Sequence, residues 1–236
     1  MDGTAYAGAP DGGQWPGPVW SALDEYLWFT CDIVADLIEG RLDQRPLVPT
    51  RARVRPGERV LAVGHGQRHT WRGLGDGRYT QTSVFAYGSP VFVLGSLAGN
   101  AMGNAARRNN AARDAQPRWV VEGSGEVTIT PAAVYFGHPT YWLSLYWEGL
   151  ETIDLVAPDV VQASFRNTHQ NGSYTTVRLC TPWASLIFVL AGLGCFTAHP
   201  QLLGRGWLPP DFEERCAAVG RPCRPAPAMV VTRLTG

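Results

Sequence analysis

The stretch GSGEVTITPAAVYFG, residues 123–137, decides the fold class, because its apolar residues recur at every second position. Val127 and Ile129 form one alternating pair, and Val134 and Phe136 form the next. A period of two is typical of strands that bury one face and expose the other. The following GHPT, residues 137–140, consists of turn residues. The stretch therefore predicts neighbouring strands of an antiparallel sheet.

The same alternation extends in both directions from this stretch. Trp119 and Val121 precede it, and one strand face after it carries Tyr141, Leu143, Leu145 and Trp147. Further short strands are expected at 153–155, 161–165 and 174–179, and the Asn171-Gly172 pair is a tight-turn signal before the last of them. Together these segments predict an antiparallel meander of about five strands.

A strongly apolar helix is predicted to follow the meander. Thr181 is a suitable N-cap, Pro182 fits the first helical position, and the apolar run continues to Phe196. Because the run is apolar on nearly every side, the helix must be buried over most of its surface. A shorter polar helix is expected at 210–219, where acidic residues lie near its positive N-terminal end.

Upstream, residues 18–42 predict an amphipathic helix. Ser21 and Asp24 have the spacing of a capping box, and Gly40 is a suitable stop. The apolar stripe contains Leu23, Tyr26, Leu27, Thr30, Ile33, Val34, Leu37 and Ile38. A connector rich in Pro and Arg follows, and strands are expected from Val60 and within 73–88.

Two windows, 79–106 and 179–204, contain no Asp, Glu or Arg and are long enough to cross a membrane. Proline, glycine and polar residues limit their strongly apolar runs to 90–97 and 183–196. Runs of that length are typical of buried core helices, and residues 90–115 have the composition of a helical insertion. Membrane insertion through the two windows stays open as an alternative.

The 236 residues are 45% hydrophobic and include 9 Trp, 8 Tyr and 8 Phe, which predicts an ordered chain of one large domain or a small domain with appended elements. No lysine occurs, which excludes Schiff-base chemistry and the lysine-containing phosphate loop. The formal net charge is +0, which argues against non-specific binding to nucleic acid.

The five cysteines are an odd number and contain no C-x-x-C pair, so neither a disulfide framework nor a four-ligand zinc site is indicated. Cys180 and Cys195 are expected to be core thiols. The N-terminus lacks the basic and apolar regions of a secretory signal and is expected to be a flexible leader. These features predict a cytoplasmic protein. In the alternative hypothesis the protein is also peripheral to a membrane.

No motif predicts catalysis, a metal site or a cofactor. His65 and His69 are four residues apart, but the glycines around them argue against a helix and no third ligand is near. Glu148, Glu151 and Asp154 are interpreted as solvent-facing residues. The sequence contains neither a G-x-S-x-G elbow nor a G-x-G-x-x-G motif between a strand and a helix.

Read together, 123–137, 141–155, VVQASF at 160–165 and TTVRLCTPWASLIFVL at 175–190 resemble the bacterial pleckstrin-homology-like and GRAM-like domains. The matching positions are Gly125, Thr130, Val134, Phe136, Trp147, Leu150 and Ile153. PGERVLAVG, 56–64, is similar to the opening of such domains. The resemblance covers about 56–200 and implies a partly open antiparallel β-barrel capped by an apolar C-terminal helix, acting as a binding scaffold without enzymatic activity.

We therefore expect an α+β protein with a leader at 1–17, a helix and connector at 18–55, a pleckstrin-homology-like domain at 56–200 interrupted by the insertion at 90–115, and a C-terminal extension at 201–236. The leading hypothesis is an intracellular module that binds a protein partner or self-associates. The alternatives are a peripheral lipid-binding protein and an enzyme of unrecognised class. The candidate interaction surface comprises Trp28, Phe29, Arg51, Arg53, Arg55, Trp71, Trp142 and Trp207.

Overall fold

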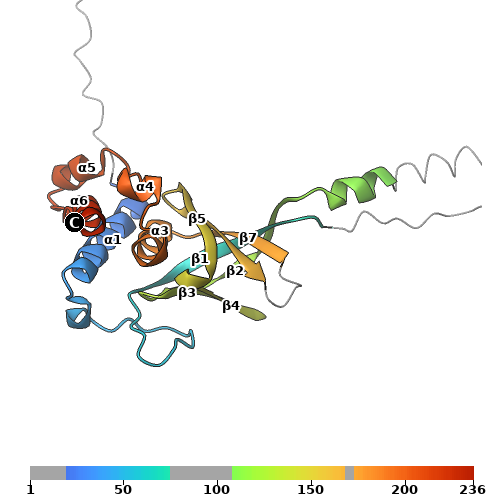
Figure 1. The fold of residues 1–236 in the computed structure, drawn as a ribbon, viewed down its shortest axis with the longest axis horizontal. Helices are drawn as coiled ribbons and strands as arrows, with labels where there is room; N and C mark the ends of the chain where they lie inside the picture. Colours follow the sequence, from blue (N-terminus) through green and yellow to red (C-terminus); the bar gives the residue numbers. More distant parts are fainter. Residues whose placement is uncertain (1–19, 75–107, 168–172) are drawn as a thin grey trace, which may run out of the picture.

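The structure, a computed structural model, describes residues 20–74, 108–167 and 173–236 (Figure 1). The predicted leader at 1–17, the window 79–106 and the Asn171-Gly172 turn lie outside these residues. The strand expected within 73–88 lies almost entirely outside them as well. Of the predicted insertion at 90–115, residues 108–115 are described, and they are helical.

Helix α1, Ala22–Ile38, confirms the amphipathic helix predicted near the N-terminus. The capping box is present, because the Asp24 N–H donates to the Ser21 hydroxyl and the Ser21 N–H donates to the Asp24 carboxylate. Gly40 adopts a φ of +70°, a left-handed conformation that favours glycine after a helix end. The short 3-10 helix η1, Leu42–Gln44, follows.

Seven strands form one antiparallel sheet in the order β4-β3-β2-β1-β7-β6-β5. The sequence predicted a strand from Val60, which is β1, and a meander of about five strands from Trp119 onward, where the structure has six. Their bounds are β1 Ala62–Arg72, β2 Arg118–Ile129, β3 Ala133–His138, β4 Tyr141–Tyr146, β5 Leu150–Ala157, β6 Val160–Asn167 and β7 Ser173–Cys180, with the 3-10 helix η2, Trp147–Gly149, between β4 and β5. Strand β1 pairs with β2 along its whole length and also with β7 through Gln67–Thr70. It thereby joins a four-stranded meander to a three-stranded one.

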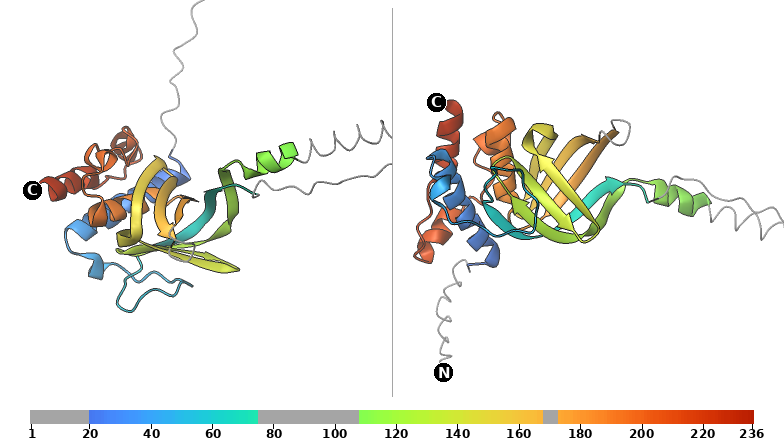
Figure 2. Two further views of the ribbon diagram at one scale, coloured as in Figure 1. Left: turned by 45° about the vertical axis from the view of Figure 1, so that its right-hand side comes forward. Right: turned by 90° about the horizontal axis from the view of Figure 1, so that it is seen from below.

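The sheet curls into a half-barrel around an apolar interior (Figure 2). Helix α3, Ala184–Cys195, packs against β5, β6 and α1, so it lies between the sheet and the other helices. Residues 186–191 of α3 are each no more than 2% exposed, which confirms that this apolar helix is buried. Among the described residues, no helix combines the length and the apolar character needed to span a membrane.

The predicted start of α3 at Pro182 is wrong by two residues. The helix begins at Ala184, and Trp183, not Thr181, is its N-cap residue. The Thr181 hydroxyl donates to the carbonyl oxygen of His65 at 3.0 Å, and Trp183 Nε1 donates to that of Val63 at 3.2 Å. These bonds tie residues 181–183 to β1 and hold them in a turn ahead of the helix.

Three more helices complete the layer beyond α3: α4 Pro200–Leu203, α5 Phe212–Ala218 and α6 Ala226–Thr235. Helix α5 confirms the polar helix expected at 210–219, whereas α6 was not predicted. Helix α6 packs on α1, and ion pairs reinforce the layer, including Arg215 with Asp24 at 2.8 Å and Arg224 with Asp36 at 2.6 Å.

Asp36 is the centre of this layer, because Arg41, Arg45 and Arg224 all contact its carboxylate. Burial alone would raise the pKa of Asp36, but hydrogen bonds from Arg224, Arg45 and Arg41 hold that pKa below its usual value. The ionised carboxylate therefore stabilises the fold above its ordinary pKa, and this contribution is lost as the pH falls through the lowered value.

We expect Asp36→Asn to lower the free energy of unfolding by about 1.5–3 kcal/mol at neutral pH. The difference from wild type should shrink as the pH falls below about 4. Urea denaturation across that range measures both effects. Asp43→Asn, an exposed carboxylate on η1, is the control and should change stability by less than about 0.5 kcal/mol. A difference from wild type that stays constant with pH would contradict the role given to the charge.

Candidate interaction surface

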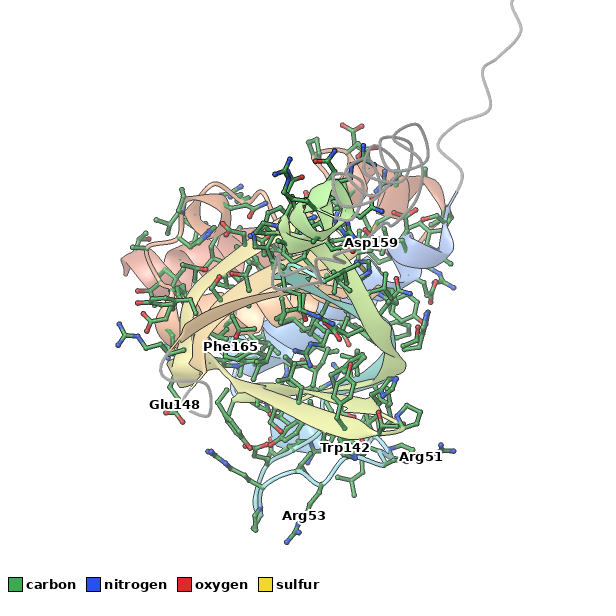
Figure 3. The ribbon with its side chains drawn as sticks, turned by 90° about the vertical axis from the view of Figure 1, so that its right-hand side faces the viewer. Arg51, Arg53, Trp142, Glu148, Asp159 and Phe165 are labelled. Carbon is green, nitrogen blue, oxygen red and sulfur yellow. The ribbon has the colours of Figure 1, made fainter. Side chains whose placement is uncertain are left out.

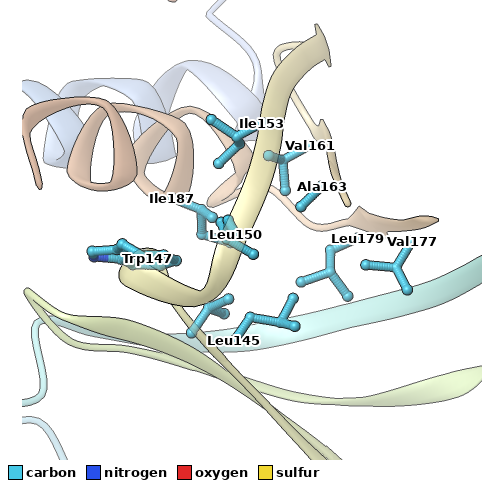
Figure 4. A pocket seen from close by; sticks show the side chains of 10 residues that line it. Leu145, Trp147, Leu150, Ile153, Val161, Ala163, Val177, Leu179 and Ile187 are labelled. Carbon is cyan, nitrogen blue, oxygen red and sulfur yellow. The ribbon is translucent and has the colours of Figure 1, made fainter. Parts of the chain in front are cut away.

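The interior of the half-barrel is filled by side chains. Its cavity measures about 10 Å³, close to the space of one water molecule (Figure 4). Only apolar side chains line it: Val134, Leu145, Trp147, Leu150, Ile153, Val161, Ala163, Val177, Leu179 and Ile187. The described interior of the half-barrel therefore has no room for a ligand.

The connector before β1 folds back over the outer face of the sheet. The Thr50 hydroxyl and the Arg51 N–H both donate to Glu126 Oε1 on β2, each at 3.0 Å. The Thr50 hydroxyl also lies 2.7 Å from that of Thr128. These bonds fix the first half of the segment 50–58 to β2.

A second anchor holds the other half of the segment 50–58 to β3 and β4. The Tyr135 hydroxyl donates to Glu58 Oε2 at 2.6 Å and lies 2.7 Å from the Tyr146 hydroxyl. Burial, the Glu58 carboxylate and Tyr146 together raise the pKa of Tyr135, so its phenol stays protonated and remains a donor. Ala52 packs beside Tyr135 in a small apolar cluster. The segment is therefore held at both ends.

Between and beside these anchors the segment displays Arg51, Arg53 and Arg55, all exposed. The Arg55 guanidinium stacks on the Tyr146 ring at 3.5 Å from its centroid and lies 3.9 Å from the exposed Glu148 carboxylate. Within the residues that the structure describes, Arg51 and Arg53 form no ion pair. Figure 3 shows both of them at the side of the molecule that also carries Trp142.

Trp142 adds an apolar surface next to these arginines. It is 55% exposed and stands on the outer face of β4, in register with Gly137 of β3. A side chain at Gly137 would meet the Trp142 ring within 2.7 Å, so the ring lies directly over the glycine backbone. We call Arg51, Arg53, Arg55 and Trp142 the Arg–Trp surface.

Among the described residues Arg51 and Arg53 have no ion-pair partner, in contrast to the arginines of the helical layer. There Arg45 and Arg224 contact Asp36 at 2.6 Å, and Arg215 contacts Asp24 at 2.8 Å. Those guanidinium groups stabilise the fold. The side chains of Arg51 and Arg53 are exposed to solvent instead.

The other candidate residues lie elsewhere. Trp28 and Phe29 are on α1, where Trp28 Nε1 donates to the Pro222 carbonyl and Phe29 borders a groove of about 600 Å³. Trp71 is 48% exposed and packs on Trp119 near the end of β1. Across the sheet, the residue of β1 in register with Gly137 and Trp142 is His65. Trp71 lies six positions further along β1 and is therefore distant from Trp142. The candidates thus form three separate surfaces.

Trp207 is not an interface residue, which corrects the prediction. It is 1% exposed and belongs to the same core cluster as Leu202 and Phe212. The sequence around Trp207 is rich in Gly and Pro and has no periodicity, so it gave no sign that the loop between α4 and α5 is folded onto the core.

The histidines and carboxylates that the sequence analysis considered do not form a metal site among the described residues. His69 contacts Gln67 at 2.8 Å, and His65 is exposed on β1. Glu148, Glu151 and Asp154 are exposed, as the sequence indicated. In the described ranges no group of three His, Cys, Asp or Glu side chains is placed to hold a metal ion. Cys195 is exposed and Cys180 half-buried, so the expectation of two core thiols is wrong.

The anchors of the segment 50–58 were missed at the sequence level. Tyr135 and Tyr146 alternate with the core residues Val134, Phe136 and Leu145, so they belong to the outer face. Large aromatic residues on a face expected to meet solvent are the signal that another segment covers it.

Comparison with known proteins adds no relative: no family model and no curated protein matches this chain. The resemblance to pleckstrin-homology-like domains therefore rests on the chain's own residues. Its function is argued below from the chemistry of the Arg–Trp surface, because fold alone does not define function.

Proposed function

We propose that this protein is a non-enzymatic interaction module that binds an extended acidic segment of a partner protein through the Arg–Trp surface. The observation that carries the proposal is the pair Arg51 and Arg53, held on an anchored segment and facing solvent without a carboxylate partner among the described residues. Arg, Trp and Tyr are enriched where interfaces concentrate their binding energy. An anchored segment also loses little conformational entropy when a partner binds.

We propose a pleckstrin-homology-like scaffold for this module. The division of seven strands into four and three, followed directly by α3, supports it. So do residues of the resemblance: the Thr130 hydroxyl accepts the Ala133 N–H at 3.0 Å in the β2–β3 turn, and Trp147 Nε1 donates to the Pro131 carbonyl at 2.8 Å. On this proposal, α3 caps one end of the half-barrel.

The two edges of the sheet suggest where an extended segment would lie. At the β5 edge, the Gln201 side chain accepts from the Leu155 N–H at 3.3 Å and donates to its carbonyl at 2.9 Å, in the place of a further strand. Strand β4 is the opposite edge and carries Trp142. A partner strand added beside β4 would form main-chain hydrogen bonds while its acidic side chains contact Arg51 and Arg53.

Charge favours a protein partner over the other hypotheses. Cytoplasmic membrane surfaces are typically recognised by about 4–8 clustered basic residues, whereas this surface has Arg51, Arg53 and Arg55 in a chain of formal net charge +0. Two-fold self-association through this face would bring like charges together. An acidic segment of a partner protein needs only a few basic residues and brings opposite charges together.

The test uses a fluorescent peptide of alternating glutamate and valine, with binding followed by anisotropy at several salt concentrations. We expect Arg51→Ser with Arg53→Ser to weaken binding at least about tenfold, since each lost charged contact contributes roughly 1 kcal/mol. Arg108→Ser with Arg113→Ser removes the same charge from exposed positions on the 108–115 helix and should leave binding unchanged.

Equal losses in the two double variants would show that net charge alone acts and would refute the site. Failure to bind the peptide, together with salt-sensitive sedimentation with phosphatidylserine vesicles that Arg51→Ser with Arg53→Ser abolishes, would instead favour the peripheral membrane hypothesis.

A further inference from the structure

A groove of about 600 Å³ lies between the first half of α1, the residues ahead of α3 and the start of β1. Its volume is in the range of sites that bind small molecules. It has no residue in common with the Arg–Trp surface. Besides Ser21, Ala22, Glu25 and Val63, four aromatic side chains line it: Trp20, Tyr26, Phe29 and Trp183. We call this site the aromatic groove.

The spacing of the residues on α1 brings the rings together. Glu25, Tyr26 and Phe29 lie three and four residues apart from one another or side by side, so they share one face of the helix. The Tyr26 and Trp183 rings meet at 89° with their centroids 4.8 Å apart, and their planes form a corner. Trp183 is 7% exposed and Phe29 is 39% exposed, so aromatic surface extends from the buried side of the groove to its rim.

Hydrogen bonds within the chain hold the two indole rings in place. Trp183 Nε1 donates to a carbonyl oxygen of β1 at 3.2 Å, and Trp20 Nε1 donates to Glu25 Oε2 at 3.1 Å. The Ser21 hydroxyl donates to the carboxylate of the capping box at 2.7 Å. A ligand therefore meets ring surfaces, the Tyr26 hydroxyl and a carboxylate, and the lining side chains offer it no free N–H group.

Glu25 is the only charged residue among those that line the groove. Its Oε2 accepts from Trp20 and from Arg221, whereas no described residue donates to its Oε1. Arg221 lies outside the lining, with its guanidinium 5.6 Å from the centroid of the Trp20 ring. One cation of this chain thus already pairs with this carboxylate and an indole ring. Aromatic faces and an acceptor oxygen are the features that attract a cation.

We propose that the aromatic groove binds a free small molecule that carries a quaternary ammonium group. Such a cation has no N–H donor and is recognised by aromatic rings that surround it. A primary ammonium is strongly hydrated and would lose its bonds to water without enough acceptors to replace them. A peptide would bring carbonyl groups that need N–H donors, which the lining side chains do not supply. This inference goes beyond the proposed function and does not depend on it.

The test titrates choline into the full-length protein and follows binding by saturation-transfer NMR. The compound for comparison is 3,3-dimethylbutanol, which has nearly the same shape but a carbon atom in place of the charged nitrogen. We expect choline to bind at least about tenfold more tightly, because only choline interacts with the ring faces and Glu25 as a cation.

The two partners of the ion pair at the rim should have opposite effects. Glu25→Gln keeps an acceptor for Trp20 but removes the charge, and it should weaken choline binding about threefold. Arg221→Ser frees the Glu25 carboxylate from its internal cation, and it should tighten choline binding. Loss of local structure would weaken binding in both variants and would contradict the role given to Glu25.

Phe29→Leu retains an apolar side chain but removes a ring, so it should weaken choline binding about threefold and leave the neutral compound unchanged. Tyr174→Leu is the matched control, because Tyr174 is a 61% exposed aromatic residue on β7 and does not line the groove. It should change the affinity for neither compound.

Equal affinities for choline and the neutral compound would overturn the proposal, as would equal losses in Phe29→Leu and Tyr174→Leu. If choline did not bind and Phe29→Leu abolished sedimentation with phosphatidylcholine vesicles, the ligand would be a lipid headgroup and the assignment to a free compound would be wrong. Arg51→Ser with Arg53→Ser should bind choline as wild type does, so this result is independent of the Arg–Trp surface.

Discussion

Replacing Asp24 with alanine is expected to lower the free energy of unfolding by about 3–5 kcal/mol. Asp24 is 4% exposed and has two roles. One carboxylate oxygen accepts from the N–H and the hydroxyl of Ser21, which completes the cap of α1, and the other accepts from Arg215 at 2.8 Å. The substitution therefore removes the cap and leaves a largely buried guanidinium without its inner partner.

Asp211→Ala is the matched control, because Asp211 contacts the other terminal nitrogen of the same guanidinium at 3.0 Å but is half exposed. Exposed pairs contribute little, so this variant should lose no more than about 1 kcal/mol. Urea denaturation measures both variants. If Asp24→Ala cost no more than Asp211→Ala, the buried pair would not be what holds α5 to α1.

Local patterns in the sequence predicted the elements well. Ser21 and Asp24 are three residues apart, and the capping box needs nothing else. The apolar run of α3 required burial, whatever covered it. The joining of β1 to the strands 150–180 was not predicted, because the pairing of β1 with β7 links Gln67–Thr70 to residues more than a hundred positions away. No local spacing records such a pairing.

The sites could be predicted only in part, for the same reason. Arg51, Arg53 and Arg55 are close in sequence and were recognised as a cluster. Their placement beside Trp142 depends on bonds to Glu126 and Tyr135, which are remote from them in the chain.

The alternative of membrane insertion through the window 79–106 is constrained by the strands that flank it. Strands β1 and β2 remain paired up to Arg72 and Arg118, and beyond them the Leu74 N–H donates to the Asp114 carbonyl at 2.7 Å. The two flanks of the segment 75–107 thus lie side by side. A single crossing of a bilayer would place them on opposite sides, so any contact of this segment with a membrane would have to begin and end on one side.

Gly125→Ala should destabilise the protein by about 3 kcal/mol, near the upper end for overpacking. An added methyl group would overlap the carbonyl oxygen of Gly137 and lie 2.7 Å from its carbonyl carbon. Both are backbone atoms of the paired strand β3, so no side-chain rotation relieves the overlap. The strands would have to separate, which explains why the glycine of the stretch 123–137 is needed where β2 meets β3.

Gly149→Ala is the control, since a methyl group there meets nothing within 4 Å, and its stability should stay within about 0.5 kcal/mol of wild type. Gly125 also precedes Glu126, which anchors the segment 50–58, and its overlap partner Gly137 supports Trp142. Gly125→Ala should therefore also weaken peptide binding where the variant is still folded, whereas Gly149→Ala should not. If the urea concentration at the midpoint of unfolding were the same for Gly125→Ala as for wild type, β2 and β3 would not approach each other as described.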